Sequence, residues 1–297
     1  MNSSIKKILV PIDLTEFSEA AISNAVSMAK LLNAEVFLIH VLAVNDYYFS
    51  IVPEMRTLLP SITEIEVSVK KRMEELQANV TKQSGITPNV FVTTGNIETE
   101  IIDFSKKKKI DLILMGTHGA SGYKELFIGS NAQRVVSLSD IPVLTMQNGI
   151  QKPEFKNILL PIDNSLHSRE KLNIVMVIAN LFGAIIHLLG LPDSDKKEDL
   201  DKFNIKMKSI GEIITAEKLS FKASIVDGDN IAKAALAYAK ENKCDLIAVN
   251  TGHESKITGI FPGLFAQQIV NHSTIPVLSI KHTEGHYDIT TPGFGIG

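Results

Sequence analysis

Short runs of Ile, Leu and Val alternate along the chain with segments in which apolar residues recur every three or four positions. The uninterrupted runs predict strands, and the periodic segments predict helices between them. Because the strand-like runs lack polar alternation, both of their faces must be covered, as in a parallel sheet. In the first half the predicted strands are 8–12, 35–41, 89–93, 112–115 and 143–146, and the predicted helices are 18–32, 64–83, 98–108 and 130–137.

The sequence contains an internal repeat of this pattern. The segment Lys6–Asp13 recurs as Lys156–Asp163, and Ile141–Met146 recurs as Ile275–Ile280. A repeat this long indicates two duplicated domains rather than a solenoid. Alternating strands and helices predict an α/β fold with a doubly wound, five-stranded parallel sheet in each copy, of the Rossmann-like or flavodoxin-like type. In such sheets ligands bind at the carboxyl ends of the strands, where the strand order reverses.

The boundary between the copies falls where Gly149 and Pro153 lie among polar residues. We expect an N-terminal domain over 1–148, a C-terminal domain over 154–282 and a flexible tail over 283–297. The second copy is shorter, and the additional residues of the first copy lie around 45–62. This insertion follows a strand at the ligand side of the sheet, so it is either a lid or a packing excursion or dimer contact.

The composition of the chain limits the partners and the cellular location that we expect. The chain has 297 residues, 44% of them hydrophobic and 21% charged, with a net charge of −3, so nucleic acid and anionic membranes are not expected partners. The single cysteine, Cys244, excludes an internal disulfide and precedes an apolar run, which favours a core residue over a reactive thiol. No apolar run approaches the ~20 residues that span a bilayer. We expect a cytoplasmic protein.

Candidate ligand-binding residues follow the end of the fourth predicted strand. Gly116-Thr117-His118-Gly119 follows the apolar run, and Gly129-Ser130-Asn131 opens the next helix. Glycines allow backbone N–H groups to approach phosphate oxygens closely, and a helix N-terminus adds the positive end of its dipole. The pattern therefore predicts a phosphate-binding loop rather than simple turns. His118 either donates to a phosphate or is an exposed loop histidine.

A carboxylate ends the neighbouring first strand. Asp13 could accept hydrogen bonds from a ribose hydroxyl or an adenine amino group; the alternative is an N-cap for the following helix, although Thr15 and Ser18 are available for that role. The basic run Lys106–Lys109 is interpreted as a solvated helix end. His282 and His286 lack a carboxylate or cysteine at ligand spacing and do not predict a metal site.

With these residues the chain resembles the universal stress protein family in its tandem, two-domain form. The family's nucleotide-binding signature, Gly-x2-Gly-x9-Gly-[Ser/Thr], is matched by Gly116-x2-Gly119-x9-Gly129-Ser130, and Asp13 and the stretch Leu114–Gly119 are also similar. The resemblance covers residues from about Lys6 to Ile280. It implies the strand order 3-2-1-4-5 in each domain and an adenine nucleotide, ATP or AMP, in the first copy, with Mg²⁺ as a companion of ATP.

The resemblance also implies roles for particular residues. The adenosine would be bordered by Pro11, Ile12 and Asp13. The backbone of Val41 would contact adenine, and Met115 would help to line the pocket. The ribose and phosphates would be surrounded by Gly116, His118, Gly119, Gly129, Ser130 and Asn131.

The second copy departs from the signature. Asn250, His253 and Leu264 stand where the first copy has Gly116, Gly119 and Ser130, although Asp163 keeps the strand-one carboxylate. We therefore expect no nucleotide there and a structural role, as a built-in partner of the first copy. Family dimers pair through the last strand, which implies that 141–146 and 275–280 meet across a pseudo-twofold axis. A further homodimer stays open.

Three functions follow from these features. The leading one is a nucleotide-binding regulatory protein of the stress response. The second is an ATP-using enzyme, either a slow ATPase or of the adenylyl-transfer type, although no catalytic set or Gly-Lys-[Ser/Thr] phosphate loop is recognisable. The third is a nucleotide-free interaction scaffold.

Overall fold

The computed structural model describes residues 5–43, 62–116, 129–147, 154–164, 171–192, 194, 196–226, 230–251 and 264–281. The N-terminal half contains β1 (Lys7–Pro11), α1 (Glu16–Leu32), β2 (Glu35–Ala43), α4 (Ile62–Ser84), β3 (Asn89–Gly95), α5 (Ile97–Lys108), β4 (Leu112–Gly116), α6 (Ser130–Leu138) and β5 (Val143–Met146). Strands and helices alternate as the apolar pattern predicts, with ends that differ by one or two residues. The insertion at 45–62 lies outside the described residues, apart from Ile62 at the start of α4.

The C-terminal half repeats this order. It contains β6 (Asn157–Ile162), α7 (Leu172–Phe182), β7 (Ile185–Gly190), α8 (Lys197–Ala216), β8 (Ser220–Ile225), α9 (Ile231–Glu241), β9 (Leu246–Thr251), α10 (Leu264–His272) and β10 (Val277–Lys281). Local signals recur as well: Asn96 and Asn230 cap α5 and α9, each accepting a hydrogen bond from the backbone N–H three residues on. The tail from 282 onward lies outside the described residues.

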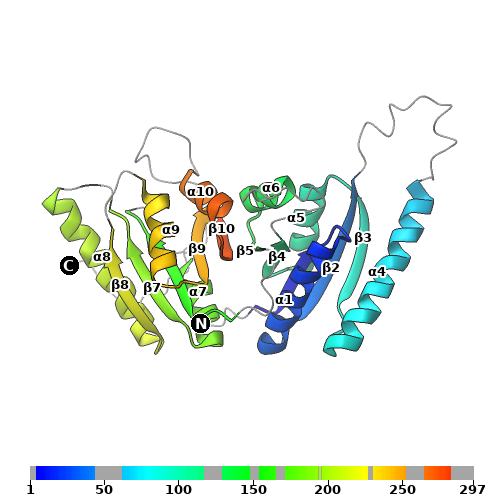
Figure 1. Ribbon diagram of the computed structural model, residues 1–297, viewed down its shortest axis with the longest axis horizontal. Helices are drawn as coiled ribbons and strands as arrows, with labels where there is room; N and C mark the ends of the chain where they lie inside the picture. The colour runs from blue at the N-terminus through cyan, green and yellow to red at the C-terminus, as the bar shows by residue number, and fades with distance from the viewer. Residues whose placement is uncertain are drawn as a thin grey trace, which may run out of the picture.

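Among the residues that the structure describes, one ten-stranded sheet runs through both halves, in the order β3-β2-β1-β4-β5-β10-β9-β6-β7-β8 (Figure 1). Pairing is parallel within each half and antiparallel between β5 and β10, where Leu144 lies opposite its counterpart Leu278. The structure thus confirms the predicted α/β class, the order 3-2-1-4-5 in each half and the pairing of the last strands about a pseudo-twofold axis. This pairing also covers two sheet edges that would otherwise be open.

Helices cover both faces of the sheet. One face packs against α1, α4, α7 and α8, and the other against α5, α6, α9 and α10. Central strand residues such as Leu112 and Leu246 are completely buried, and burying one such side chain contributes about 1.5–3 kcal/mol. Cys244 is buried in the second of these layers, and burial raises the pKa of its thiol to about 12, which confirms it as a core residue.

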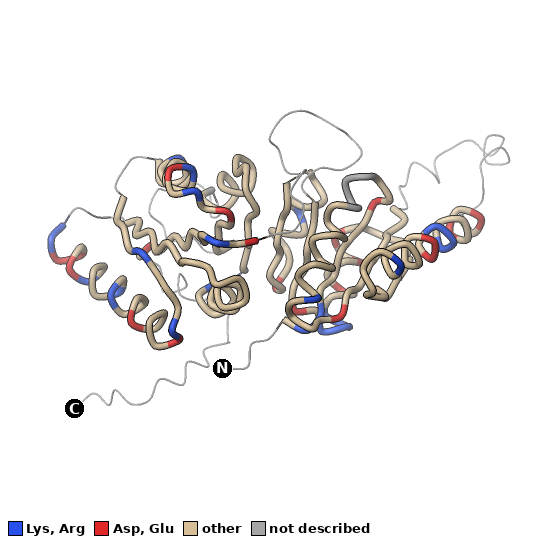
Figure 2. Tube along the Cα trace, turned by 60° about the horizontal axis from the view of Figure 1, so that its bottom comes forward, with Lys and Arg blue, Asp and Glu red and all other residues tan. Residues whose placement is uncertain are grey.

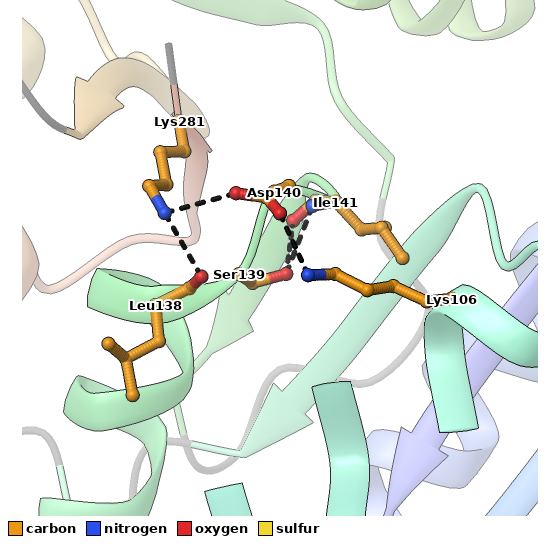
Figure 3. Close-up of polar contacts among 6 residues, drawn as sticks. All are labelled: Lys106, Leu138, Ser139, Asp140, Ile141 and Lys281. Atoms are coloured by element: carbon orange, nitrogen blue, oxygen red, sulfur yellow. Dashed lines mark hydrogen bonds and ion pairs between the residues drawn. The ribbon is translucent and has the colours of Figure 1, made fainter. Parts of the chain in front are cut away.

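Polar contacts join the halves beside β5 and β10 (Figure 3). Lys281 Nζ donates to the carbonyl of Leu138 at 3.2 Å and to Asp140 at 3.0 Å, and Lys106 Nζ lies 3.1 Å from the other oxygen of Asp140. Hydrogen bonds from Lys281 and Lys106 hold the pKa of Asp140 below its usual value. Lys106 is therefore more than part of a solvated helix end: it belongs to an ion-pair network at the interface.

Candidate functional site

The carboxyl edge of the N-terminal half of the sheet gathers most of the predicted site residues. β1 lies between β2 and β4, so the strand order reverses between β1 and β4. Pro11 ends β1, and Met115 and Gly116 end β4. Val41 lies near the end of the neighbouring β2. These residues therefore share the edge at which doubly wound sheets bind their ligands.

The loop after β1 presents Asp13 at this edge. Asp13 is exposed, and its Oδ1 accepts hydrogen bonds from the backbone N–H of Thr15 at 3.1 Å and from the Thr15 hydroxyl at 2.6 Å. Thr15, not Asp13, is the N-cap residue of α1, and Asp13 instead braces a tight turn of its own backbone. Leu14 lies between them in the left-handed region, with φ of 60°.

Two further side chains hold the same loop, and the sequence interpretation missed both. His40 Nδ1 lies 2.8 Å from the carbonyl oxygen of Ile12, and Arg72 Nη2 donates to the carbonyl of Leu14 at 3.1 Å. Because a carbonyl can only accept, Nδ1 of His40 carries the proton in this contact. His40 could have been noticed as a polar residue inside an apolar strand, whereas nothing in the sequence marks Arg72 among the other charges of its helix.

The N-terminus of α6 faces the same edge, since this helix follows β4. Its N-cap is Gly129, which supplies no side-chain hydrogen bond, and the first turn carries no acidic residue. Ser130 and Asn131 are exposed. A helix start without a side-chain cap leaves backbone N–H groups for an anion. His118 and Gly119 lie in 117–128, outside the described residues, so their roles stay predictions.

An ion pair flanks this helix. Arg134, one turn along α6, lies 3.1 Å from Glu98 in the first turn of α5. The pKa of Glu98 is lowered, first by a hydrogen bond from its own backbone N–H and further by Asn96 and Arg134. The charges of Arg134 and Glu98 offset each other, so the pair adds no net charge beside the start of α6. The positive end of the helix dipole therefore comes from the backbone N–H groups of α6.

The corresponding edge of the C-terminal half is filled by apolar side chains. Strand register places Gly190 where the first half has His40. A Cβ atom added at Gly190 would lie 2.8 Å from Cε1 of Phe203 and 3.1 Å from Cγ1 of Ile225, and Phe203 is only 2% exposed. Leu191, the counterpart of half-buried Val41, is buried as well.

The second half also lacks the first half's strand-end glycine. Asn250 pairs with Ile280 just as Gly116 pairs with Met146. The second half therefore has an asparagine side chain at the position where the first half has glycine. His253 and Gly263 lie outside the described residues, and Leu264 is the first residue of α10. Asp163 keeps its place after β6.

Two features of the described part of the chain bear on metals and on membranes. No group of three or more His, Cys, Asp or Glu side chains there could hold a metal ion. None of the helices described is both long and apolar enough to cross a membrane.

The fold and the two strand edges thus define a tandem, doubly wound α/β protein whose halves differ at the carboxyl ends of their strands. A model of the universal stress protein family matches the chain twice, over residues 4–147 and 154–281. The chain belongs to the universal stress protein family.

Individual relatives agree with this assignment. Universal stress protein MJ0531 of Methanocaldococcus jannaschii is 32% identical over 149 residues, which are 48% of this chain and 82% of that protein. Universal stress protein MJ0577 of the same organism is 28% identical over 158 residues, 50% of this chain and 98% of that protein. A crystal structure of a universal stress protein from Archaeoglobus fulgidus covers 95% of this chain and 99% of its own, with a TM-score of 0.71 at 20% identity, which shows a shared fold.

Proposed function

We propose that the N-terminal half binds one adenine nucleotide, ATP or AMP, and that the protein acts as a nucleotide-loaded regulator in a stress response. The observation that carries this proposal is the contrast between the two edges. The first edge combines an exposed carboxylate, a strand-end glycine and an uncapped helix start, whereas the second is filled around Phe203.

The residues of the first edge suit the parts of a nucleotide. The carboxylate of Asp13 can accept from a ribose hydroxyl or an adenine amino group, and Met115, whose buried side chain lies near the end of β4, can line the pocket. Gly116, Gly129, Ser130 and Asn131 offer backbone N–H groups, a hydroxyl and an amide to the phosphates. His118 and Gly119 complete the signature, and Mg²⁺ would accompany ATP.

The C-terminal half serves as the built-in partner of the first half in this proposal, joined to it through β5 and β10. Association of two such chains into a further homodimer is compatible with it. A cytoplasmic location also belongs to the proposal, in keeping with the single cysteine, Cys244, whose thiol is free and buried.

Swapping one residue between the halves tests the proposed site. Ser130→Leu gives the first half the residue found at the second, and it should weaken ATP and AMP binding by about 10- to 100-fold, because a hydrogen bond to a charged group contributes about 1.5–3 kcal/mol. Isothermal titration measures the affinity. Since Ser130 is exposed, the unfolding midpoint should not change.

The reciprocal variant Leu264→Ser is the matched control and should leave one site per chain. Unchanged affinity in Ser130→Leu would contradict the proposed site, and a second tight site in Leu264→Ser would contradict the inactive second half. Turnover that requires a second substrate would instead favour an ATP-using enzyme, and failure to bind ATP or AMP would favour an interaction scaffold.

A further inference from the structure

We infer that Arg72 is a positioning residue for the nucleotide: from α4 it holds the β1–α1 loop in the conformation that presents Asp13 at the ligand edge. This inference rests on the proposed function. The contact that defines it joins Nη2 of Arg72 to the carbonyl oxygen of Leu14 at 3.1 Å, across 58 positions of sequence.

The loop needs an external restraint. Leu14 has φ of 60°, a left-handed conformation that costs a residue with a β-carbon free energy and persists only where the surroundings impose it. Arg72 donates to the carbonyl of this same residue. The guanidinium therefore binds the loop at its most strained position.

The other hydrogen bonds of this loop, from His40 and Thr15, do not replace the contact from Arg72. His40 holds the carbonyl of Ile12 at 2.8 Å, on one side of Asp13, and Arg72 holds that of Leu14 on the other. The Asp13 side chain itself contacts Thr15, inside the loop. The backbone of Asp13 is thus held between two carbonyls fixed by different elements, β2 and α4, and losing either one frees the carboxylate to move.

The second half contains a related contact, made one residue earlier in the loop. Lys206 on α8 stands where the first half has Arg72 on α4, and its Nζ donates to the carbonyl of Asp163 at 2.7 Å. Figure 2 shows basic and acidic residues following one another along both outer helices. In each half, one cation of this series reaches back to the loop after the first strand. The second half shows that a lysine can bind a backbone carbonyl of this loop, there the carbonyl of Asp163, the counterpart of Asp13.

The position of Arg72 makes a clean test possible. Its side chain is exposed on a helix at the outer end of the sheet, so replacing it opens no cavity in the core (Figure 1). Arg72→Met keeps the apolar stem and removes every donor, Arg72→Lys keeps a donor, and Lys206→Met removes the equivalent contact from the half without a nucleotide.

Two readouts on the full-length protein test the inference: the affinity for ATP by isothermal titration, and amide hydrogen exchange of the segment 12–16 without ligand. Arg72→Met should raise the Kd by about 5- to 10-fold and speed exchange of that segment, with the unfolding midpoint unchanged. Arg72→Lys should restore the Kd to within about 3-fold, and Lys206→Met should bind ATP like the wild type.

Wild-type affinity in Arg72→Met would overturn the inference, because that variant keeps the apolar stem and should bind normally if Arg72 acts only by packing. An Arg72→Lys variant as weak as Arg72→Met would overturn it as well, since lysine keeps a donor for the loop carbonyl. If the wild type binds neither ATP nor AMP, the proposed function fails. Hydrogen exchange still decides on the loop in that case: unchanged exchange in Arg72→Met would show that Arg72 does not hold it.

Discussion

The two halves share one fold, but polar side chains in one half stand where the other half has apolar ones. On the face covered by α5 in the first half and α9 in the second, three equivalent positions are apolar in one and polar in the other. The first half has three packed rings, with centroids 4.7 Å apart for the nearest pair: Phe37, Phe91 and Phe104. The second half has a hydrogen-bonded set at the same places: His187, Ser224 and Tyr238.

The polar set is buried and connected. His187 is 1% exposed; its Nε2 lies 3.1 Å from the Asn157 side-chain oxygen and its Nδ1 lies 3.3 Å from the hydroxyl of Tyr238, which contacts Ser224 at 3.2 Å. Burial, with a smaller effect of the positive charge on Lys222, lowers the pKa of His187. The imidazole is therefore held neutral at pH 7, as a member of a satisfied network.

At the ligand edge the contrast runs the other way. There the first half has His40, and the second half has Gly190 covered by Phe203, although both halves keep an aspartate after their first strand. The two halves thus fill equivalent places of one fold with different side chains, because a sheet layer needs its interior filled and its buried polar groups hydrogen-bonded, and several sets of residues meet both needs. The first half thus has the more polar of the two edges, and this is the edge to which we assign the proposed nucleotide.

Removing the residue that fills the second edge should have the largest effect on stability. Phe203→Ala leaves a cavity beneath Gly190 and should lower the free energy of unfolding by about 3–5 kcal/mol. Val69→Ala, at the same place on α4, truncates a smaller and only partly buried side chain and should cost less than half as much. Urea unfolding measures both, and equal losses would show that the two edges are packed alike.

The His187 network should make the second half sensitive to acid. The folded protein has a lowered pKa at His187, so below the unfolded value of about 6.5 the unfolded chain binds more protons. The free energy of unfolding should therefore fall as the pH drops below about 6.5, by at most about 1.4 kcal/mol per pH unit from this group. His187→Phe, which installs the residue of the first half, should flatten that dependence between pH 7 and 5.5.

Urea unfolding at several pH values gives the two curves, and their difference isolates His187 from other titrating groups. The variant should also be less stable at pH 7, because Asn157 and Tyr238 lose their partner. Parallel curves for wild type and His187→Phe would show that the network does not titrate in this range.

The interface network should have the smallest effect. Lys281→Met removes the contacts to Asp140 and Leu138, yet the three charged side chains are partly exposed, and such pairs contribute about 0.2–1 kcal/mol. Its counterpart is Gln147, which donates to the carbonyl of Ser273 at 3.2 Å, so Gln147→Ala is the matched control. Thermal unfolding should show small shifts for both; dissociation of the halves in either would mean that side chains, rather than strand pairing, hold the interface.

Much of the fold could be predicted because its signal is local. The run Leu112–Gly116 is apolar at every position before the glycine, and all four of those side chains are buried. The cap of α5 is equally local, since the Asn96 side chain accepts a hydrogen bond from the backbone N–H of Thr99. The pairing of β5 with β10 was predicted from the family resemblance, since no local pattern identifies the partner of an edge strand.

The remaining features depend on contacts between distant segments. His40 reaches Ile12 and Arg72 reaches Leu14 only because strand order brings β2 and α4 beside the first loop. The glycine signature shows which residues the second half lacks at this edge. It does not show that Phe203 packs there, because Phe203 lies on α8, outside the signature. Such contacts follow from packing, and the sequence does not encode them at any one position.

The most direct test of an N-terminal nucleotide site is to denature the purified protein and to identify and count what it releases, by mass spectrometry and nucleotide quantitation. About one adenine nucleotide per chain is the expected result, and its phosphate count distinguishes ATP from AMP. Two nucleotides per chain would contradict the filled second edge, and an empty protein that also fails to bind added ATP or AMP would contradict the nucleotide site itself.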